Sequence, residues 1–297
     1  MTNIGKPFQG QIWWAEEVDY NQGWVTGTTS YLISDKVQDV RIETGEIQTP
    51  LRGISSPSVC GWTKSNFDPT LHVEWILQPD TNSLAVKCCD RTSTGTLPSL
   101  AFIVGANTDG DNATQSWWKL NGCVCKTFTI SSSRGEPYVC TADFSVATIQ
   151  DSSATIGDKP AAIDGAYASF NYAGSITWTG VTGSAWVTDS FDITVENNVT
   201  DYYTVGSHDK KCAIPGAVDI TGSCDISLDD GGGAHWDEII LNKDISSLVI
   251  DTGVGVGVDD KWTLSDGKFT SGSIDINISG EGMMTSQPFR FKHLTIE

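Results

Sequence analysis

Hydrophobic and polar residues alternate with a period of two along most of this chain, and turn residues separate the alternating runs. Successive side chains of a β-strand point to opposite faces, so the pattern predicts antiparallel strands with one buried face. The clearest runs are Leu71–Leu77, Lys126–Ser131, Tyr138–Val146, Phe191–Val195 and Ser273–Ile278. We therefore expect a mainly β fold, built as an antiparallel β-sandwich or a partly closed barrel.

Helical signals are almost absent. One short helix is expected at Trp236–Leu241 and a second near Asn82–Val86. The 30 glycines, with steps such as Asn121-Gly122, supply the residues of positive φ that tight turns between strands need. One or two short helices at the edge of a β fold are the expectation.

Large apolar residues become scarce between about Ala147 and Asp164, which is typical of a connector. Alternating strand pairs lie on both sides of it, at Cys123–Val146 and at Trp186–Leu228, and suggest an internal duplication. We place a first β domain at residues 1–150 and a second at residues 151–297. The alternative is a single composite domain.

The charge balance excludes one class of function. Lys plus Arg total 18 against 37 Asp plus Glu, a net charge of -19. A specific nucleic-acid reader needs a cationic footprint on phosphates, which this composition does not provide. No signal peptide and no membrane span of roughly 20 apolar residues is recognised, so we expect a soluble protein made in the cytoplasm. Its 8 cysteines are then expected to be mostly reduced thiols rather than disulfides.

Catalytic and cofactor motifs are not recognised. None of the 4 histidines stands in a nucleophile setting, and Gly253–Gly257 lacks the strand and helix of a dinucleotide-binding turn. Cys123-Val124-Cys125 lacks the spacing of a zinc site, and the loop at Asp109–Asn112 lacks the later glutamate of a calcium loop. We expect no enzyme, no metal and no cofactor.

The 11 tryptophans leave one bottom-up alternative, a carbohydrate-binding or carbohydrate-cleaving β-sandwich, because tryptophans stack on sugars and carboxylates cleave glycosides. The adjacent pairs Trp13-Trp14 and Trp117-Trp118 need another explanation. Neighbours on a strand face opposite sides, so one of each pair should be exposed or covered by a partner. These tryptophans are therefore candidates for contacts between subunits: Trp13, Trp14, Trp117 and Trp118.

Several segments resemble the tail tube proteins of tailed bacterial and archaeal viruses. The segment Leu97–Gly105 is followed by the strand Leu120–Ser132, a short turn of Gly and Glu, and the strand Tyr138–Val146, in the order and spacing of that family. In the second half, Ser190–Val199 and Ile214–Asp230 are similar to the family's later strand pair. An arginine usual in the family is replaced at Ala217 or Val218, and with it one inter-subunit contact.

The resemblance implies a structural virion protein whose strands join those of identical neighbours into rings stacked as a tube. The implied partners are further copies of the chain in trimeric or hexameric rings, a tape-measure protein, a tail terminator and baseplate or tip proteins. Double-stranded DNA would pass non-specifically through the channel, with no role for a membrane. The inner tube of a contractile injection system is a further alternative with the same fold.

An acidic channel would let DNA slide, because Lys and Arg contacts would otherwise hold its phosphates. The candidates for side chains that face the lumen are Asp192, Glu196, Asp225 and Asp275. The long loop Lys36–Pro57 carries Arg41 and Arg52, which are candidates for contacts with the next ring or subunit.

Overall fold

A computed structural model describes residues 10–23, 31–32, 37–45, 48–52, 59–64, 66–77, 82–89, 91, 95–107, 115–152, 175–180, 187–205, 207, 209–227, 244–251, 261–271 and 284–296. The first half of the chain contains β1 (Gly10–Glu16), β2 (Tyr31–Leu32), β3 (Val37–Glu43), β4 (Gln48–Arg52), β5 (Val59–Lys64), β6 (Thr70–Ile76), α1 (Asn82–Cys89), β7 (Leu100–Asn107), β8 (Gln115–Ser133), β9 (Val139–Ser145) and β10 (Thr148–Ser152). The second half contains β11 (Ser175–Thr179), β12 (Val187–Glu196), β13 (Thr200–Tyr203), β14 (Lys210–Ile214), β15 (Asp219–Ser227), β16 (Asp244–Asp251), β17 (Lys261–Phe269), β18 (Met284–Phe291) and β19 (His293–Ile296).

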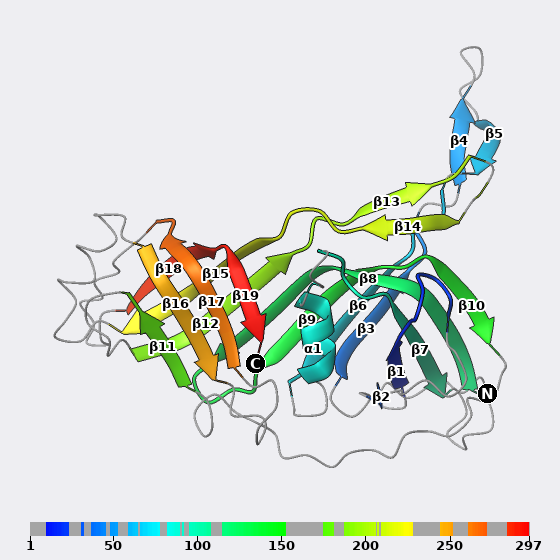
Figure 1. Ribbon diagram of the computed structural model, residues 1–297. Coiled ribbons are helices and arrows are strands. Elements are labelled where there is room, and N and C mark those ends of the chain that lie inside the picture. Colours follow the sequence, from blue (N-terminus) through cyan, green and yellow to red (C-terminus); the bar gives the residue numbers. More distant parts are fainter. Residues whose placement is uncertain are drawn as a thin grey trace.

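One layer of antiparallel strands runs through both halves in the order β3-β6-β9-β8-β12-β15-β18 (Figure 1). Alternation gives this layer one apolar and one polar face, as on β6, where Leu71, Val73 and Trp75 are buried and His72 and Glu74 are partly exposed. The halves join where β8 pairs with β12. Buried apolar side chains from both halves form one continuous cluster on the apolar side.

Two shorter layers cover the apolar face of this long layer. In the first half, β1, β7, β10 and the start of β8 form the cover, and Phe102 of β7 meets Phe144 of β9 with ring centroids 4.9 Å apart. In the second half, β11, β16, β17 and β19 form the cover, and Trp178 of β11 meets Phe289 of β18 at 5.9 Å. Each half is thus a sandwich of two layers.

Strand β8 belongs to both layers of the first half, and it changes layer at Gly122. Residues up to Asn121 pair with β7 or β10, and Cys123 still pairs with Leu100 of β7, whereas residues from Val124 onward pair with β9 and later with β12. Gly122 has a φ of 65°, and a Cβ there would lie 2.5 Å from the Cβ of Ala147. Only glycine fits both this backbone conformation and this close approach.

Strand pairings of the first half recur in the second half in the same order. The matching pairs are β1·β7 with β11·β16, β3·β6 with β12·β15, β4·β5 with β13·β14, β6·β9 with β15·β18, β7·β8 with β16·β17, β8·β9 with β17·β18, and β8·β10 with β17·β19. The register agrees as well: Trp14 stands opposite Phe102 in β1·β7, and Trp178 stands opposite Leu248 in β11·β16.

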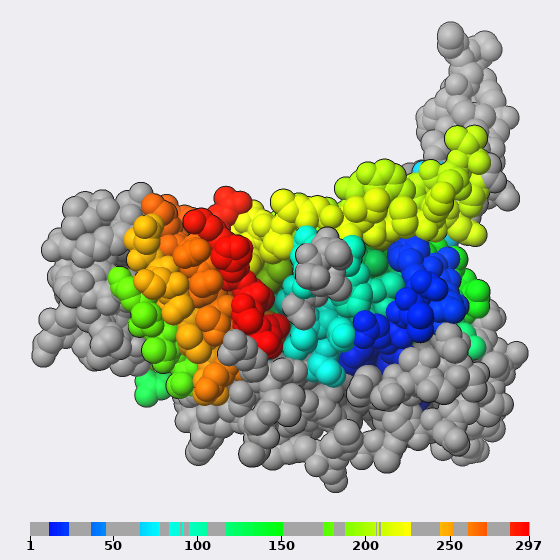
Figure 2. Space-filling view, in the orientation of Figure 1, coloured from blue at the N-terminus to red at the C-terminus, as the bar shows by residue number. Residues whose placement is uncertain are grey.

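Two hairpins leave the layers at equivalent places, since β4-β5 lies between β3 and β6 in the chain and β13-β14 lies between β12 and β15. In Figure 1 β4 and β5 stand out from the body, whereas β13 and β14 run along its upper edge. Figure 2 shows the yellow-green residues of the second hairpin above the blue residues of the first half.

The mainly β, sandwich-like fold is confirmed, and the described strands form no closed barrel. The helix expected near Asn82–Val86 is α1, and Trp236–Leu241 and Ser273–Ile278 lie outside the described residues. Two local predictions were wrong. The first residues of the expected connector form β10, because its backbone completes the edge of β8 and Ile149 packs on the core. The expected loop Lys36–Pro57 contains strands β3 and β4.

Candidate functional site

The polar face of the long layer extends across the strands of both halves, from β3 to β18. Residues paired across neighbouring strands share a face, so the pairings give its composition row by row. One row consists of Asp39, Glu74, Thr141, Thr129, Thr194, Thr221 and Arg290. The row on one side consists of Arg41, His72, Asp143, Thr127, Glu196 and Asp219. Hydroxyl groups and carboxylates therefore make up most of these two rows, together with Arg41, His72 and Arg290.

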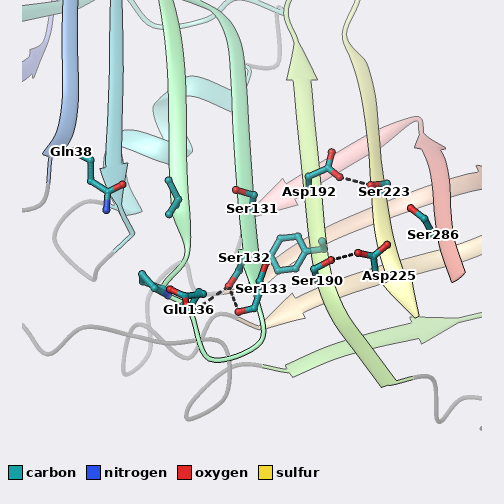
Figure 3. Close-up of a pocket in the computed structure, with 13 residues that line it drawn as sticks. Gln38, Ser131, Ser132, Ser133, Glu136, Ser190, Asp192, Ser223, Asp225 and Ser286 are labelled. Atoms are coloured by element: carbon teal, nitrogen blue, oxygen red, sulfur yellow. Dashed lines mark hydrogen bonds between the residues drawn. The ribbon is translucent and has the colours of Figure 1, made fainter. Parts of the chain in front are cut away.

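An open pocket of about 530 Å³ lies on this face where β8, β12, β15 and β18 run side by side (Figure 3). Asp192 and Asp225 line it, and each accepts a hydrogen bond from a serine of the adjacent strand. The hydroxyl of Ser190 donates to Asp225 over 2.6 Å, and that of Ser223 donates to Asp192. Short serine side chains therefore fix both carboxylates in place.

Of the side chains predicted to face a lumen, the structure brings three together on this face. Asp192 and Glu196 lie on β12, and Asp225 lies on β15, while Asp275 falls outside the described residues. The arginines of the face are engaged by carboxylates: Arg290 forms a two-pronged contact with Asp219 at 2.7 and 2.6 Å, and Arg41 lies 3.4 Å from Asp39.

A buried amide joins the two halves behind this face. The Nδ2 group of Asn197 donates to the carbonyl oxygens of Cys88 in α1 and Cys125 in β8, over 3.0 and 3.2 Å. Its Oδ1 accepts from Arg91, which also donates to the carbonyl of Gly216 at 2.6 Å. Asn197 is fully buried, so it fixes the helix, β8 and the end of β12 relative to one another.

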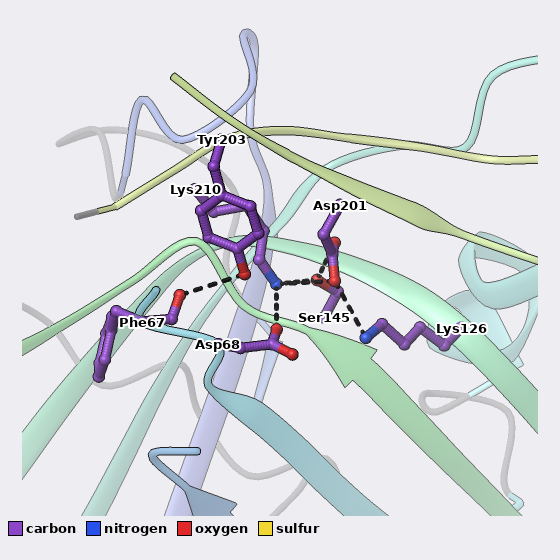
Figure 4. Close-up of polar contacts among 7 residues, drawn as sticks. All are labelled: Phe67, Asp68, Lys126, Ser145, Asp201, Tyr203 and Lys210. Carbon is purple, nitrogen blue, oxygen red and sulfur yellow. Dashed lines mark hydrogen bonds and ion pairs between the residues drawn. The ribbon is translucent and has the colours of Figure 1, made fainter. Parts of the chain in front are cut away.

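A second polar cluster, which we call the hairpin latch, attaches β13-β14 to the first half (Figure 4). It consists of Asp68, Lys126, Ser145, Asp201 and Lys210. The ammonium group of Lys210 is completely buried and lies 2.9 Å from Asp68 and 3.1 Å from Asp201. Ser145 accepts from Lys210 and donates to Asp201 over 2.6 Å, and Lys126 lies 3.1 Å from Asp201.

The electrostatics of the latch favour ionised Asp201. Burial raises the pKa of Asp201, but the hydrogen bond from Ser145 and the charges of Lys210 and Lys126 outweigh it and leave the pKa below its usual value. This cluster was not predicted from the sequence, because Lys210 and Lys211 cannot be told apart until their strand is placed against the rest of the protein. Asn197 was missed for the same reason.

A model of the phage tail tube protein family matches residues 17–291 of the chain. This chain belongs to that family. The match includes both hairpins, the hairpin latch and the described part of the polar face from β3 onward. No curated protein matches the chain. The predicted resemblance to tail tube proteins is confirmed, and it extends over nearly the whole chain.

Three of the tryptophans predicted to contact other subunits are buried inside this tail tube protein. Trp14 lies in the main core, while Trp13 and Trp117 pack together on the other side of β1, with ring centroids 5.0 Å apart. The expectation that one of each pair needs a partner was wrong for Trp13-Trp14, since the chain covers both faces of β1. Trp118 is half-buried, Arg41 is exposed, and the side chain of Arg52 lies outside the described part of β4.

The other features fit a structural tail tube protein and favour no alternative chemistry. Among the tryptophans whose side chains are described, none is exposed as a sugar platform would require. Burial raises the pKa of the thiols of Cys88, Cys123, Cys140 and Cys224, and no described cysteine forms a disulfide. In the described residues, no helix is long and apolar enough to cross a bilayer, and no group of His, Cys, Asp or Glu is arranged to hold a metal.

Proposed function

We propose that this tail tube protein assembles into stacked rings and that the polar face of its long layer lines their channel. The observation that carries the proposal is the face itself: two neighbouring rows of polar side chains, most of them hydroxyls and carboxylates, cross the strands of both halves. The opposite face is occupied by the core and its covering layers. A sheet that is polar on one side and continuous across both halves suits the wall of a water-filled channel.

The charge of the face suits the passage of double-stranded DNA. Binding to the DNA backbone depends on Lys and Arg that displace counterions from phosphates. Here Arg290 and Arg41 are paired with carboxylates, and Asp192, Asp225 and Glu196 repel phosphates. DNA would therefore move along the channel without being held. The protein would act as a structural component of the virion tail with no catalytic role.

We propose that the chain carries two tube-fold units, as predicted at residues 1–150 and 151–297, with the end of the first unit moved to Ser152, where β10 ends. The recurring pairings of the two halves support this division, and so does their junction through β8 and β12. With two units per chain, three copies supply six units to a ring. A chain that acts as one composite domain would instead need six copies.

The partners follow from the family and are proposals for this chain. They are further copies of itself, a tape-measure protein in the lumen during assembly, a tail terminator, and baseplate or tip proteins. The protein would be made in the host cytoplasm and end in the virion tail.

Negative-stain electron microscopy and sedimentation of the purified protein over a range of concentrations test the assembly. We expect rings or tubes with an open channel, whose fraction rises with concentration. A protein that remains monomeric at every concentration, also after addition of preformed tail tips, would contradict the proposal.

The orientation of the polar face can be tested with matched threonine variants. Thr194 lies on the polar face of β12, and Thr177 is exposed on β11 in a covering layer. We expect tubes of Thr194→Lys to retain short duplex DNA in a nuclease-protected, salt-sensitive form, because each ring adds cations to the channel. Tubes of Thr177→Lys should protect no more DNA than the parent. Equal protection by both variants would contradict a lumen position of the polar face.

A further inference from the structure

Equivalent apolar residues of the two halves differ in burial on β3, at the edge of the long layer, and on β12, in its middle. Ile42 of β3 and Ile193 of β12 occupy matching positions in the two halves. Ile42 is aligned through β6 with Phe144 of β9, and Ile193 is aligned through β15 with Phe289 of β18. Ile193 is completely buried, whereas Ile42 and its neighbour Val40 are only partly buried. Within the described residues, the first half therefore covers this surface less completely than the second half does.

The tryptophans of the covering layers repeat this difference. Trp118 stands opposite Val104 in β7·β8, and Trp262 stands opposite Ile250 in β16·β17. Trp262 is completely buried and stacks on Phe128, with ring centroids 5.6 Å apart. Trp118, its counterpart, is half-buried. Trp118 is thus partly buried, like Val40 and Ile42, where its counterpart in the second half is completely buried.

The cause of the difference is the position of β8. Ile193 pairs with Ile130 of β8, and Trp262 stacks on Phe128 of the same strand, so the first half covers the edge of the second. Among the described residues, β3 pairs with β6 alone and no strand covers its other edge. The edge that holds Val40 and Ile42 is therefore the open counterpart of a junction that exists inside the chain.

The opposite end of the molecule carries the matching open surface. At the internal junction, Lys126 and Ser145 of the first half contact Asp201 of the hairpin latch. Their counterparts in the second half, judged from the pairings of β8·β9 and β17·β18, are Thr270 and Arg290. Both line an open pocket of about 540 Å³ at β16, β17 and β18.

We infer that Val40, Ile42 and Trp118 form the surface on which the second half of a neighbouring copy of this chain packs. The contact repeats the internal junction, with β3 in the place of β12 and Trp118 in the place of Trp262. The pocket lined by Thr270 and Arg290 receives the neighbour's first half. This inference rests on the proposed assembly into rings, and it names the surfaces that close them.

Charge placed in the open surface tests the inference. A lysine at position 42 can extend its ammonium group to solvent in the free chain, but in the junction it would be buried without a partner. We expect Ile42→Lys to fold with the circular dichroism and melting temperature of the parent, and to need at least about a tenfold higher concentration to form rings. Thr177→Lys, the control on β11, should assemble like the parent.

A second variant acts on the receiving pocket and leaves β3 unchanged. Thr270 is exposed, so Thr270→Trp should fold normally and block assembly by filling the pocket. If Ile42→Lys lowers the melting temperature of the monomer, its effect on assembly is not specific, and the inference is then tested by ring formation of Thr270→Trp. Normal ring formation by a folded Ile42→Lys or by Thr270→Trp would overturn the docking surface while the ring proposal stands. A parent protein that never assembles would instead refute the ring proposal itself.

Discussion

The ammonium group of Lys210 is completely buried, and its contacts explain how the β13-β14 hairpin is held. A two-stranded hairpin is marginal by itself in water, so its position depends on what it contacts. The hairpin latch satisfies Lys210 with Asp68, Ser145 and Asp201. Removing one partner leaves a buried charge with less compensation, which is more costly than the loss of an exposed ion pair.

We therefore expect Asp201→Asn to lower the free energy of unfolding by roughly 3 kcal/mol, measured by urea denaturation of the monomer. Lys268→Ala removes an exposed ion pair, 3.1 Å long, with Asp244 and should cost less than about 1 kcal/mol. Equal effects of the two substitutions would contradict the role of the latch.

The same latch predicts a dependence on pH. The pKa of Asp201 lies below its usual value of 3.8, so its stabilising contribution is complete above that value and is lost as the pH falls through the lowered pKa. The difference in stability between the parent and Asp201→Asn should therefore be constant near neutral pH and shrink below about 3.8. Unfolding curves from neutral to acidic pH measure it, and a difference that grows in acid would refute the assignment.

Gly105 provides a second residue-level test, because the ring of Trp117 lies across it on the neighbouring strand. A Cβ at position 105 would overlap this ring. We expect Gly105→Ala to cost about 1–3 kcal/mol in urea denaturation. Adding Trp117→Leu should remove most of that cost in a double-mutant cycle. Independent, additive effects would show that the overlap is relieved in another way.

At the scale of elements, alternation located the strands well wherever one face is buried. Leu71–Leu77 and Phe191–Val195 were predicted because every second residue of each run is apolar and packs into one core. The same rule failed for Trp13-Trp14, because alternation does not reveal that β1 is covered on both faces. It also could not give the change of layer at Gly122 or the pairing of β8 with β12, since these depend on contacts between residues far apart in the chain.

The junction between the elements of the two halves depends on Asn197. Asn197→Ala would leave the carbonyl groups of Cys88 and Cys125 without their side-chain donor in a buried place. We expect a loss of about 2–3 kcal/mol in the free energy of unfolding, measured in urea. Ser207→Ala, at an exposed hydroxyl, should change it by less than about 0.5 kcal/mol. A neutral Asn197→Ala would show that the junction is held by packing alone.

At the scale of the whole molecule, the long layer and the recurrence of its pairings matter most. The sequence predicted the fold class, the resemblance to tail tube proteins and three acidic residues that prove to share one face: Asp192, Glu196 and Asp225. It could not decide which polar face is continuous, because the period of two is the same in the long layer and in its covering layers. The hairpin latch could not be predicted either, because Asp68 and Lys210 are far apart in the sequence and come together only in the folded protein.

The proposal that the polar face lines the channel of stacked rings is tested most directly by cryo-electron microscopy of assembled tubes, averaged with and without imposed symmetry. We expect rings of three copies, with the polar face of β6, β9, β8, β12 and β15 on the channel wall and the covering layers outside. Tubes whose channel is lined by the covering layers β1-β7 and β11-β16 would contradict it.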